Sequence, residues 1–93
     1  MLTSSTTFTT PNGSKYLVQL CKHFAHKIDV EYDETNGRAA LPSGAAELLA
    51  DTDGLNISIT SEDEKQLGMA QHVIEDHLKR FAFREEFDAL NWS

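Results

Sequence analysis

The chain has 93 residues, of which 40% are hydrophobic and 25% are charged. This length and composition suit one ordinary globular domain, so we expect residues 1–93 to form a single domain. An excess of acidic over basic side chains gives a net charge of −7, which disfavours binding to nucleic acid or to an anionic membrane surface.

The cysteine content and the first residues indicate a compartment. Cys21 is the single cysteine, which excludes an internal disulfide and argues against an extracellular disulfide scaffold. The segment Met1–Thr7 lacks the basic start and apolar stretch of a signal peptide, and no apolar run reaches membrane-spanning length. We therefore expect a cytoplasmic location.

The first predicted elements are a strand and a helix. Residues 3–9 are rich in β-branched side chains, with weak apolar alternation, and predict an edge strand. Thr10 followed by Pro11 resembles an N-cap with proline at the first helical position. Apolar residues then recur at helical spacing, at Leu17, Leu20, Cys21, Phe24 and Ile28. The pattern predicts an amphipathic helix.

Four further strands are expected after this helix. Val30 and Tyr32 alternate with acidic residues, which is typical of a strand with one solvent-exposed face. Asn36–Gly37 then predicts a turn, and residues 38–41 predict an antiparallel return strand. The next strand, residues 45–50, follows a break at Pro42–Gly44.

The fifth strand and the second helix carry the clearest patterns. Asp51–Gly54 predicts a turn, and the following residues alternate strictly between apolar and polar up to Thr60. Ser61 and Glu64 have capping-box spacing, which predicts that a long helix begins there. The expected buried stripe of this helix is Leu67, Ala70, Ile74, Leu78 and Phe81.

The order of these elements predicts the fold class. A strand, a helix, four strands and a helix (βαββββα) imply an antiparallel sheet of about five strands with two helices on one face. The sequence therefore predicts an α+β two-layer sandwich.

Two sequence blocks carry a family resemblance. Residues 16–27, YLVQLCKHFAHK, and residues 77–85, HLKRFAFRE, resemble the bacterial family catalogued as domain of unknown function 2218. The resemblance spans nearly the whole chain and implies an association with flavin-dependent siderophore-interacting proteins that reduce ferric siderophores. It thereby implies a role near iron handling, with a siderophore-interacting flavin reductase as the partner, but assigns no residue a chemical role.

A groove between the two helices is the main candidate site. Two sets of side chains each share one flank of a predicted helix, the first being Tyr16, His23 and Lys27 and the second His77, Arg80 and Arg84. If the flanks face each other, they form a cationic, histidine-bearing groove for an anionic ligand, such as a carboxylate-rich or catecholate iron chelate. The alternative is that Lys27, Arg80 and Arg84 pair with the surplus acids Asp29, Glu31, Glu85 and Glu86.

A metal-binding protein or hydrolytic enzyme is the second candidate, with a metal ion as the cofactor. His23 and His26 lie three residues apart on the first helix, and His77 would complete a three-histidine site. Cys21 lies on the apolar stripe instead, where a small core residue is expected. The structural alternative is that the histidines border the core and bind main-chain carbonyls.

The third candidate is a non-enzymatic interaction module, with Trp92 as the contact residue. The chain has no glycine-rich phosphate loop, nucleophile elbow or paired-cysteine motif. The sequence therefore favours a non-enzymatic role over an autonomous nucleotide enzyme.

Overall fold

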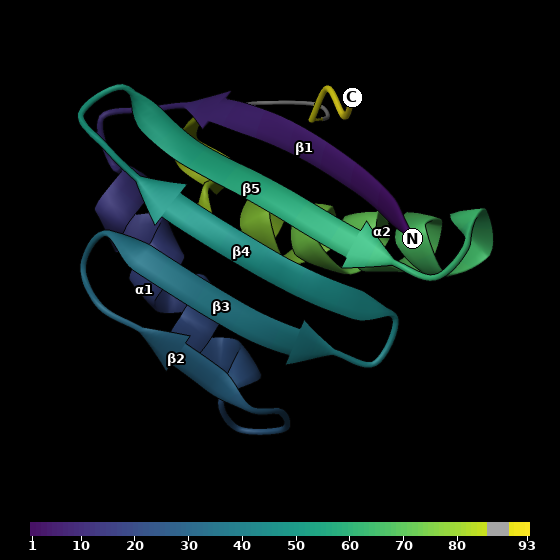
Figure 1. Ribbon diagram of the computed structural model, residues 1–93. Coiled ribbons are helices and arrows are strands. Elements are labelled where there is room, and N and C mark those ends of the chain that lie inside the picture. The colour runs from purple at the N-terminus through teal and green to yellow at the C-terminus, as the bar shows by residue number, and fades with distance from the viewer. Residues whose placement is uncertain (86–89) are drawn as a thin grey trace.

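The computed structural model describes residues 1–85 and 90–93 and contains one sheet and two long helices (Figure 1). In chain order the elements are β1 (Leu2–Thr9), α1 (Gly13–Phe24), β2 (Val30–Tyr32), β3 (Asn36–Leu41), β4 (Gly44–Ala50), β5 (Gly54–Ser61), α2 (Glu64–Phe81) and a short 3-10 helix, η1 (Phe83–Glu85). The predicted order βαββββα is confirmed.

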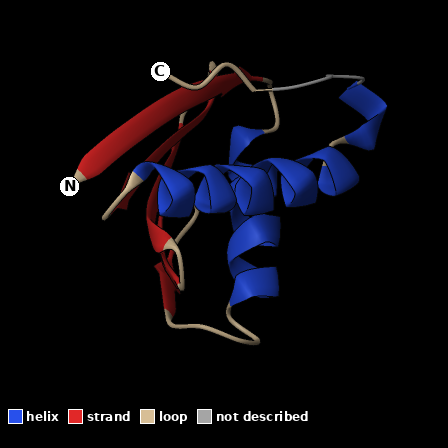
Figure 2. Ribbon diagram, turned by 90° about the vertical axis from the view of Figure 1, so that its right-hand side faces the viewer, coloured by secondary structure: helices blue, strands red, loops and turns tan. Residues whose placement is uncertain are grey.

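The five strands form one antiparallel sheet in the order β1-β5-β4-β3-β2. Both helices lie on the same side of this sheet, and the other side is left open (Figure 2). The predicted α+β two-layer sandwich is therefore confirmed, and β1 lies at a sheet edge as its weak apolar alternation indicated.

The core lies between the sheet and the helices. In β5, which lies between β1 and β4, the side chains of Leu55, Ile57 and Ile59 are buried toward the helices. The helices contribute their apolar stripes, including Leu17 from α1 and Ile74 from α2, both fully buried. Burying such side chains stabilises the fold by roughly 1.5–3 kcal/mol each.

The start of α1 differs from the prediction. The helix begins at Gly13 rather than at Pro11, and the N-cap is Asn12. Thr10 is buried, and its hydroxyl accepts a hydrogen bond from the Asn12 backbone N–H at 3.0 Å. Gly13 packs so closely on the backbone of Gly54 that an added Cβ would clash with the Gly54 carbonyl oxygen. This close approach explains why the helix begins at a glycine.

The predicted turn at Asn36–Gly37 is wrong, because both residues belong to β3. The turn precedes them, where the Asp33 carboxylate accepts hydrogen bonds from the backbone N–H groups of Thr35 and Asn36, both at 2.8 Å. Gly37 serves packing instead, since an added Cβ would lie 2.7 Å from the sulfur of Cys21.

The predicted capping box at Ser61 is also wrong. The N-cap of α2 is Asp63, whose carboxylate accepts a hydrogen bond from the Gln66 backbone N–H at 2.8 Å. Ser61 ends β5, and its hydroxyl donates to the carbonyl of Ser43 at 2.6 Å. A tertiary contact thus takes the serine away from the capping role that its spacing indicated.

The last residues lie beside the outer edge of β1 (Figure 1). Ser5 and Ser93 exchange two backbone hydrogen bonds, at 3.1 and 2.9 Å. The Leu90 side chain is buried, and its N–H donates to the carboxylate of Glu75 at 2.7 Å. Within residues 1–85 and 90–93, neither long helix is apolar enough to cross a membrane.

Candidate functional site

The helical layer brings His23 and His77 together. His23 lies in the last turn of α1, and His77 lies near the end of α2. Each helix is oriented by its buried stripe, so the side chains that border the two stripes meet where the helices pack together. The two imidazole centroids lie 4.6 Å apart. Two of the predicted groove residues, one from each helix, therefore lie side by side.

The histidine pair is supported by aromatic side chains. The Phe24 ring meets the His77 ring edge to face with centroids 5.1 Å apart, and Phe81 meets His23 at 6.0 Å. Nδ1 of His77 lies 2.7 Å from the carbonyl oxygen of Val73. A carbonyl can only accept, so Nδ1 carries a hydrogen and Nε2 is the nitrogen left for another partner.

The surroundings of His23 are cationic. Partial removal from water lowers the pKa of His23, and the nearby positive charges of His77, Lys27, His26 and Arg80 lower it further. Three of the other five predicted groove residues, namely His77, Lys27 and Arg80, therefore act electrostatically on His23. A local positive region exists in a chain whose net charge is −7.

The other two predicted groove residues lie elsewhere. Tyr16 is near the start of α1, buried, with its ring centroid 6.1 Å from that of Phe8. Arg84 belongs to η1, and its guanidinium lies 5.6 Å from the centroid of the Phe83 ring. The described contacts place neither residue against the histidine pair.

Tyr16 belongs instead to a polar cluster around Glu85. The hydroxyl of Thr10 donates to the Glu85 carboxylate at 2.9 Å and the Asn12 amide donates at 3.4 Å. Burial raises the pKa of Tyr16, and its hydrogen bond to Glu85 raises it further. Partial burial alone would raise the pKa of Glu85, but hydrogen bonds from Tyr16, Thr10 and Asn12 and the charge of Lys15 outweigh it and lower that pKa. This cluster joins η1 to the start of α1.

The candidate metal ligands are only partly assembled. His23 and His77 adjoin, and His26 is exposed in the turn after α1. Among residues 1–85 and 90–93, no three His, Cys, Asp or Glu side chains are grouped so that they could hold a metal ion. Cys21 is fully buried, as expected for a core residue, and burial raises the pKa of its thiol to about 11.

The predicted alternative of ion pairing takes a different form. Arg80 pairs with Asp76, one helical turn earlier, at 3.2 Å. Both side chains are substantially exposed, so this pair contributes at most about 1 kcal/mol and leaves Arg80 accessible. Within the described part of the chain, neither Lys27 nor Arg84 forms an ion pair. Glu86 lies outside the described residues.

The described aromatic residues near the C-terminus differ in exposure. Trp92 is half-buried and packs against the core, while Phe83 is 67% exposed. Among the described residues of this region, the exposed aromatic side chain is therefore Phe83 rather than Trp92, the contact residue that the sequence indicated.

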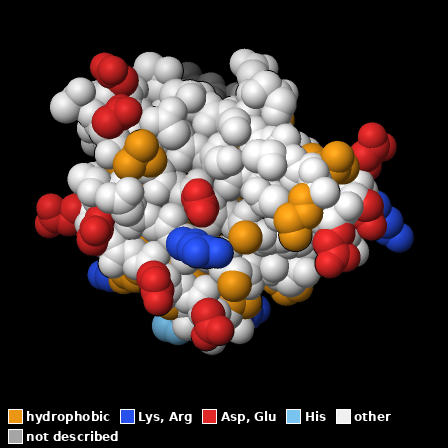
Figure 3. All heavy atoms as spheres, viewed as in Figure 1, with side chains coloured by type: hydrophobic (Ala, Val, Ile, Leu, Met, Phe, Trp, Pro, Cys, Tyr) orange, Lys and Arg blue, Asp and Glu red, His pale blue; other side chains and the backbone are white. Residues whose placement is uncertain are grey.

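The open face of the sheet carries a second candidate site, which the sequence did not indicate. A hollow of about 730 Å³ lies over its middle, and its lining includes Arg38, Glu47 and Glu31. The face is dominated by uncharged atoms. One acidic side chain lies beside a basic one near its middle, and the other acidic side chains lie toward its edges (Figure 3). Arg38 lies between the buried residues Gly37 and Ala39, and Glu47 lies between the buried residues Ala46 and Leu48. This alternation is the signal that places both charged side chains on the open face. Only the strand register shows that they are neighbours.

The comparisons with known proteins give a family. Residues 5–93 match a family described as an uncharacterised protein conserved in bacteria, DUF2218. No curated protein matches the chain. The fold is similar to the NMR structure of PA4090 from Pseudomonas aeruginosa, with a TM-score of 0.79 and 32% sequence identity over 100% of this chain and 94% of that chain. The chain therefore belongs to the uncharacterised bacterial family DUF2218.

Proposed function

We propose that this chain is a non-enzymatic accessory domain that binds an anionic ferric chelate at the surface formed by His23, Lys27, His77 and Arg80. The observation that carries the proposal is the contact between His23 and His77, with Lys27 and Arg80 close enough to lower the pKa of His23. These four residues are called the histidine patch below.

The chemistry of the histidine patch suits an anion. Lys27 and Arg80 carry permanent positive charge near neutral pH, and the Arg80 guanidinium can form two parallel hydrogen bonds to a carboxylate. Nε2 of His77 is the ring nitrogen not bound to Val73, and it can donate to an oxygen anion when the ring is protonated. Carboxylate-rich and catecholate iron chelates present several such oxygens on one surface.

The proposed setting is beside a siderophore-interacting flavin reductase in the cytoplasm. In that setting the domain would hold the ferric chelate near the flavoprotein, which would supply the electrons. The support for this partner is the family resemblance carried by the blocks around His23 and His77.

The test is calorimetric titration with a ferric tris-catecholate, which is anionic, and with a cationic ferric trihydroxamate as the matched control ligand. We expect the anionic chelate alone to bind. Lys27→Gln and Arg80→Gln should each weaken binding about tenfold, because each removes a positive charge together with its charge-assisted hydrogen bonding. Lys65→Gln, at the other end of α2, is the control and should leave the affinity unchanged.

Two results would contradict the proposal. Equal binding of the anionic and the cationic chelate would show that charge at this surface is not recognised. Unchanged affinity in the Lys27 and Arg80 variants would place the ligand elsewhere.

A further inference from the structure

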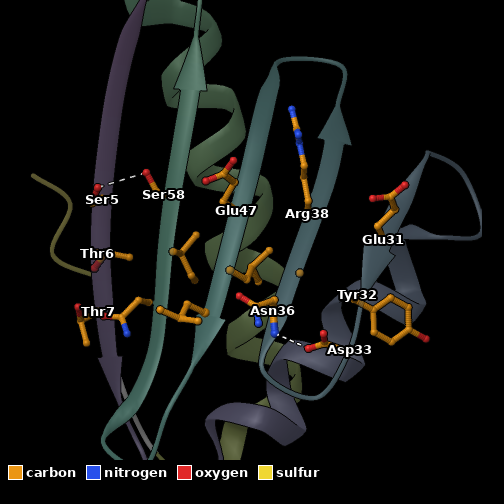
Figure 4. Close-up of a pocket in the computed structure, with 15 residues that line it drawn as sticks. Ser5, Thr6, Thr7, Glu31, Tyr32, Asp33, Asn36, Arg38, Glu47 and Ser58 are labelled. Carbon is orange, nitrogen blue, oxygen red and sulfur yellow. Dashed lines mark hydrogen bonds between the residues drawn. The ribbon is translucent and has the colours of Figure 1, made fainter.

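The open face of the sheet carries a row of polar side chains, one from each strand. The register pairs Ser5 with Ser58, Ser58 with Glu47, Glu47 with Arg38, and Arg38 with Glu31. These five side chains lie side by side across the face (Figure 4). Adjacent strands are about 4.8 Å apart, so Arg38 has a carboxylate-bearing neighbour on each side.

The charges in this row do not neutralise one another by direct contact. Across the described ranges, 1–85 and 90–93, the one ion pair within 4.0 Å is Arg80–Asp76. Arg38, Glu47 and Glu31 also form no side-chain hydrogen bond within the part of the chain that the structure describes. These three charged side chains therefore lie in a row without an ion pair or side-chain hydrogen bond to another described residue, and they remain able to bind a ligand.

Neutral polar groups extend the row on the side of β1. The hydroxyl of Ser5 donates to that of Ser58 at 3.4 Å, and the hydroxyl of Thr7 donates to the side-chain oxygen of Asn56 at 2.7 Å. In the same hollow Leu49 is 47% exposed, although it lies in the middle of the sheet. A volume of about 730 Å³ is within the range of small-molecule sites.

We propose that this hollow binds a small zwitterion of the basic amino-acid class. Arg38 would receive the α-carboxylate through two parallel hydrogen bonds. One flanking glutamate would accept a hydrogen bond from the α-ammonium group. The ammonium nitrogen lies two bonds from the carboxyl carbon, so it can reach a side chain on the adjacent strand. The other glutamate would accept from the cationic side chain, whose methylene groups would pack on Leu49.

The charge balance of the hollow selects this ligand class. Its lining carries three carboxylates, from Glu31, Asp33 and Glu47, against the single guanidinium of Arg38. A polyanion, including a ferric chelate or a nucleic acid, would be repelled by this excess. A second copy of the chain would bring six carboxylates together with two guanidiniums. A ligand with two cationic groups and one carboxylate is complementary to the row.

This inference is independent of the histidine patch, because the helices and the open face lie on opposite sides of the sheet (Figure 2). Failure at one surface leaves the other untouched. NMR distinguishes them, since shifts in β3 and β4 report the hollow and shifts at His23 and His77 report the patch.

The test is backbone amide NMR of the full chain titrated with L-lysine. We expect saturable shifts in β3, β4 and β2. Cadaverine, which lacks the carboxylate, and Nα-acetyl-lysine, which lacks the α-ammonium charge, should each bind about tenfold more weakly. Arg38→Gln and Glu47→Gln should weaken L-lysine binding to a similar degree, and both side chains are exposed, so the fold is retained. Arg80→Gln is the control and should have no effect.

Three results would overturn the proposal. One is the absence of saturable shifts with L-lysine. Another is equal binding of L-lysine and cadaverine, which would show only attraction of cations to an acidic face. The third is a set of shifts in β3 and β4 that depends on protein concentration alone, which would identify the face as a contact between copies of the chain.

Discussion

The imidazole rings of His23 and His77 lie 4.6 Å apart, although they come from helices at opposite ends of the chain. Two ionisable rings at this distance cannot both become protonated without mutual repulsion. Lys27 and Arg80 add to this repulsion at His23. A bound anion would offset this repulsion, so we expect the protonation of the two rings to change when an anion binds.

The first prediction concerns pH. The pKa of His23 is lower in the folded chain than its ordinary value, so the folded state binds fewer protons than the unfolded state as pH falls through that range. Stability should therefore fall on acidification from about pH 8 to about pH 5. Chemical denaturation of His23→Gln should show a smaller loss over this range, with His72→Gln as the exposed control on α2.

A bound anion should reverse this effect. It favours the protonated ring, so it should raise the pKa of His23 and bind more tightly as pH falls. An NMR titration of the His23 ring against pH, with and without gallium(III) tris-catecholate as a diamagnetic counterpart of the ferric chelate, measures the pKa of the ring and the affinity for the chelate. A bound-state pKa equal to the free value would mean that the anion does not approach His23.

The second prediction concerns the polar cluster at Glu85. Tyr16→Phe should lower the free energy of unfolding by about 1.5 kcal/mol near neutral pH, because it removes a hydrogen bond to a partly buried carboxylate. The pKa of Glu85 is lowered in the folded state, so its stabilising effect is present above its unfolded pKa and is lost as pH falls through the folded value. The difference between Tyr16→Phe and the wild type should shrink accordingly.

Tyr32→Phe is the matched control for this variant, since Tyr32 is 39% exposed. Denaturant unfolding at neutral and at acidic pH gives the loss in free energy of unfolding for each tyrosine variant. Equal costs for the two tyrosine variants would mean that the Glu85 cluster does not join η1 to α1 energetically.

The third prediction concerns packing between β3 and α1. Gly37→Ala should destabilise the chain by roughly 1–3 kcal/mol, because its Cβ would lie 2.7 Å from Cys21 Sγ and 3.4 Å from a Leu17 methyl carbon. The double variant Gly37→Ala/Cys21→Ala should recover part of this loss, because the sulfur that clashes is gone.

Gly68→Ala supplies a control of opposite sign. Gly68 lies inside α2, and beyond the adjacent backbone of its own helix no atom lies within 4 Å of an added Cβ. Alanine should therefore stabilise the helix by up to about 1 kcal/mol. Thermal or denaturant unfolding of the wild type, Gly37→Ala, Cys21→Ala, the double variant and Gly68→Ala measures this set. Additive effects of the Gly37 and Cys21 changes would show that the two positions do not touch.

The hydrophobic spacing within single segments predicted most of the helices and strands. The alternation from Leu55 to Thr60 and the helical spacing of Ala70, Ile74 and Leu78 gave the correct elements and the correct buried faces. The errors fall where a distant contact overrides a local preference. Thr10 resembled an N-cap, yet its hydroxyl bonds to Glu85, 75 positions later in the chain.

The candidate site was predicted only where the spacing along one segment decides which side chains share a face. Helical spacing put His23 on one flank of the first helix and His77 and Arg80 on one flank of the second, and the structure places His23 beside His77. Spacing also put Lys27 on the first helix, but α1 ends at Phe24 and Lys27 lies in the turn that follows. Tyr16 shares the flank of His23 by spacing, but it lies two turns away and packs under Phe8. The row through Arg38 needs the register of all five strands, which no single segment of sequence contains.

The most direct test of the proposed function is a histidine-resolved NMR titration of the full chain with the gallium(III) tris-catecholate, a diamagnetic counterpart of the ferric chelate. We expect saturable shifts of the His23 and His77 rings with no change at His72. Silent His23 and His77 rings at saturating chelate, or equal shifts at all four histidines, would contradict the proposed function.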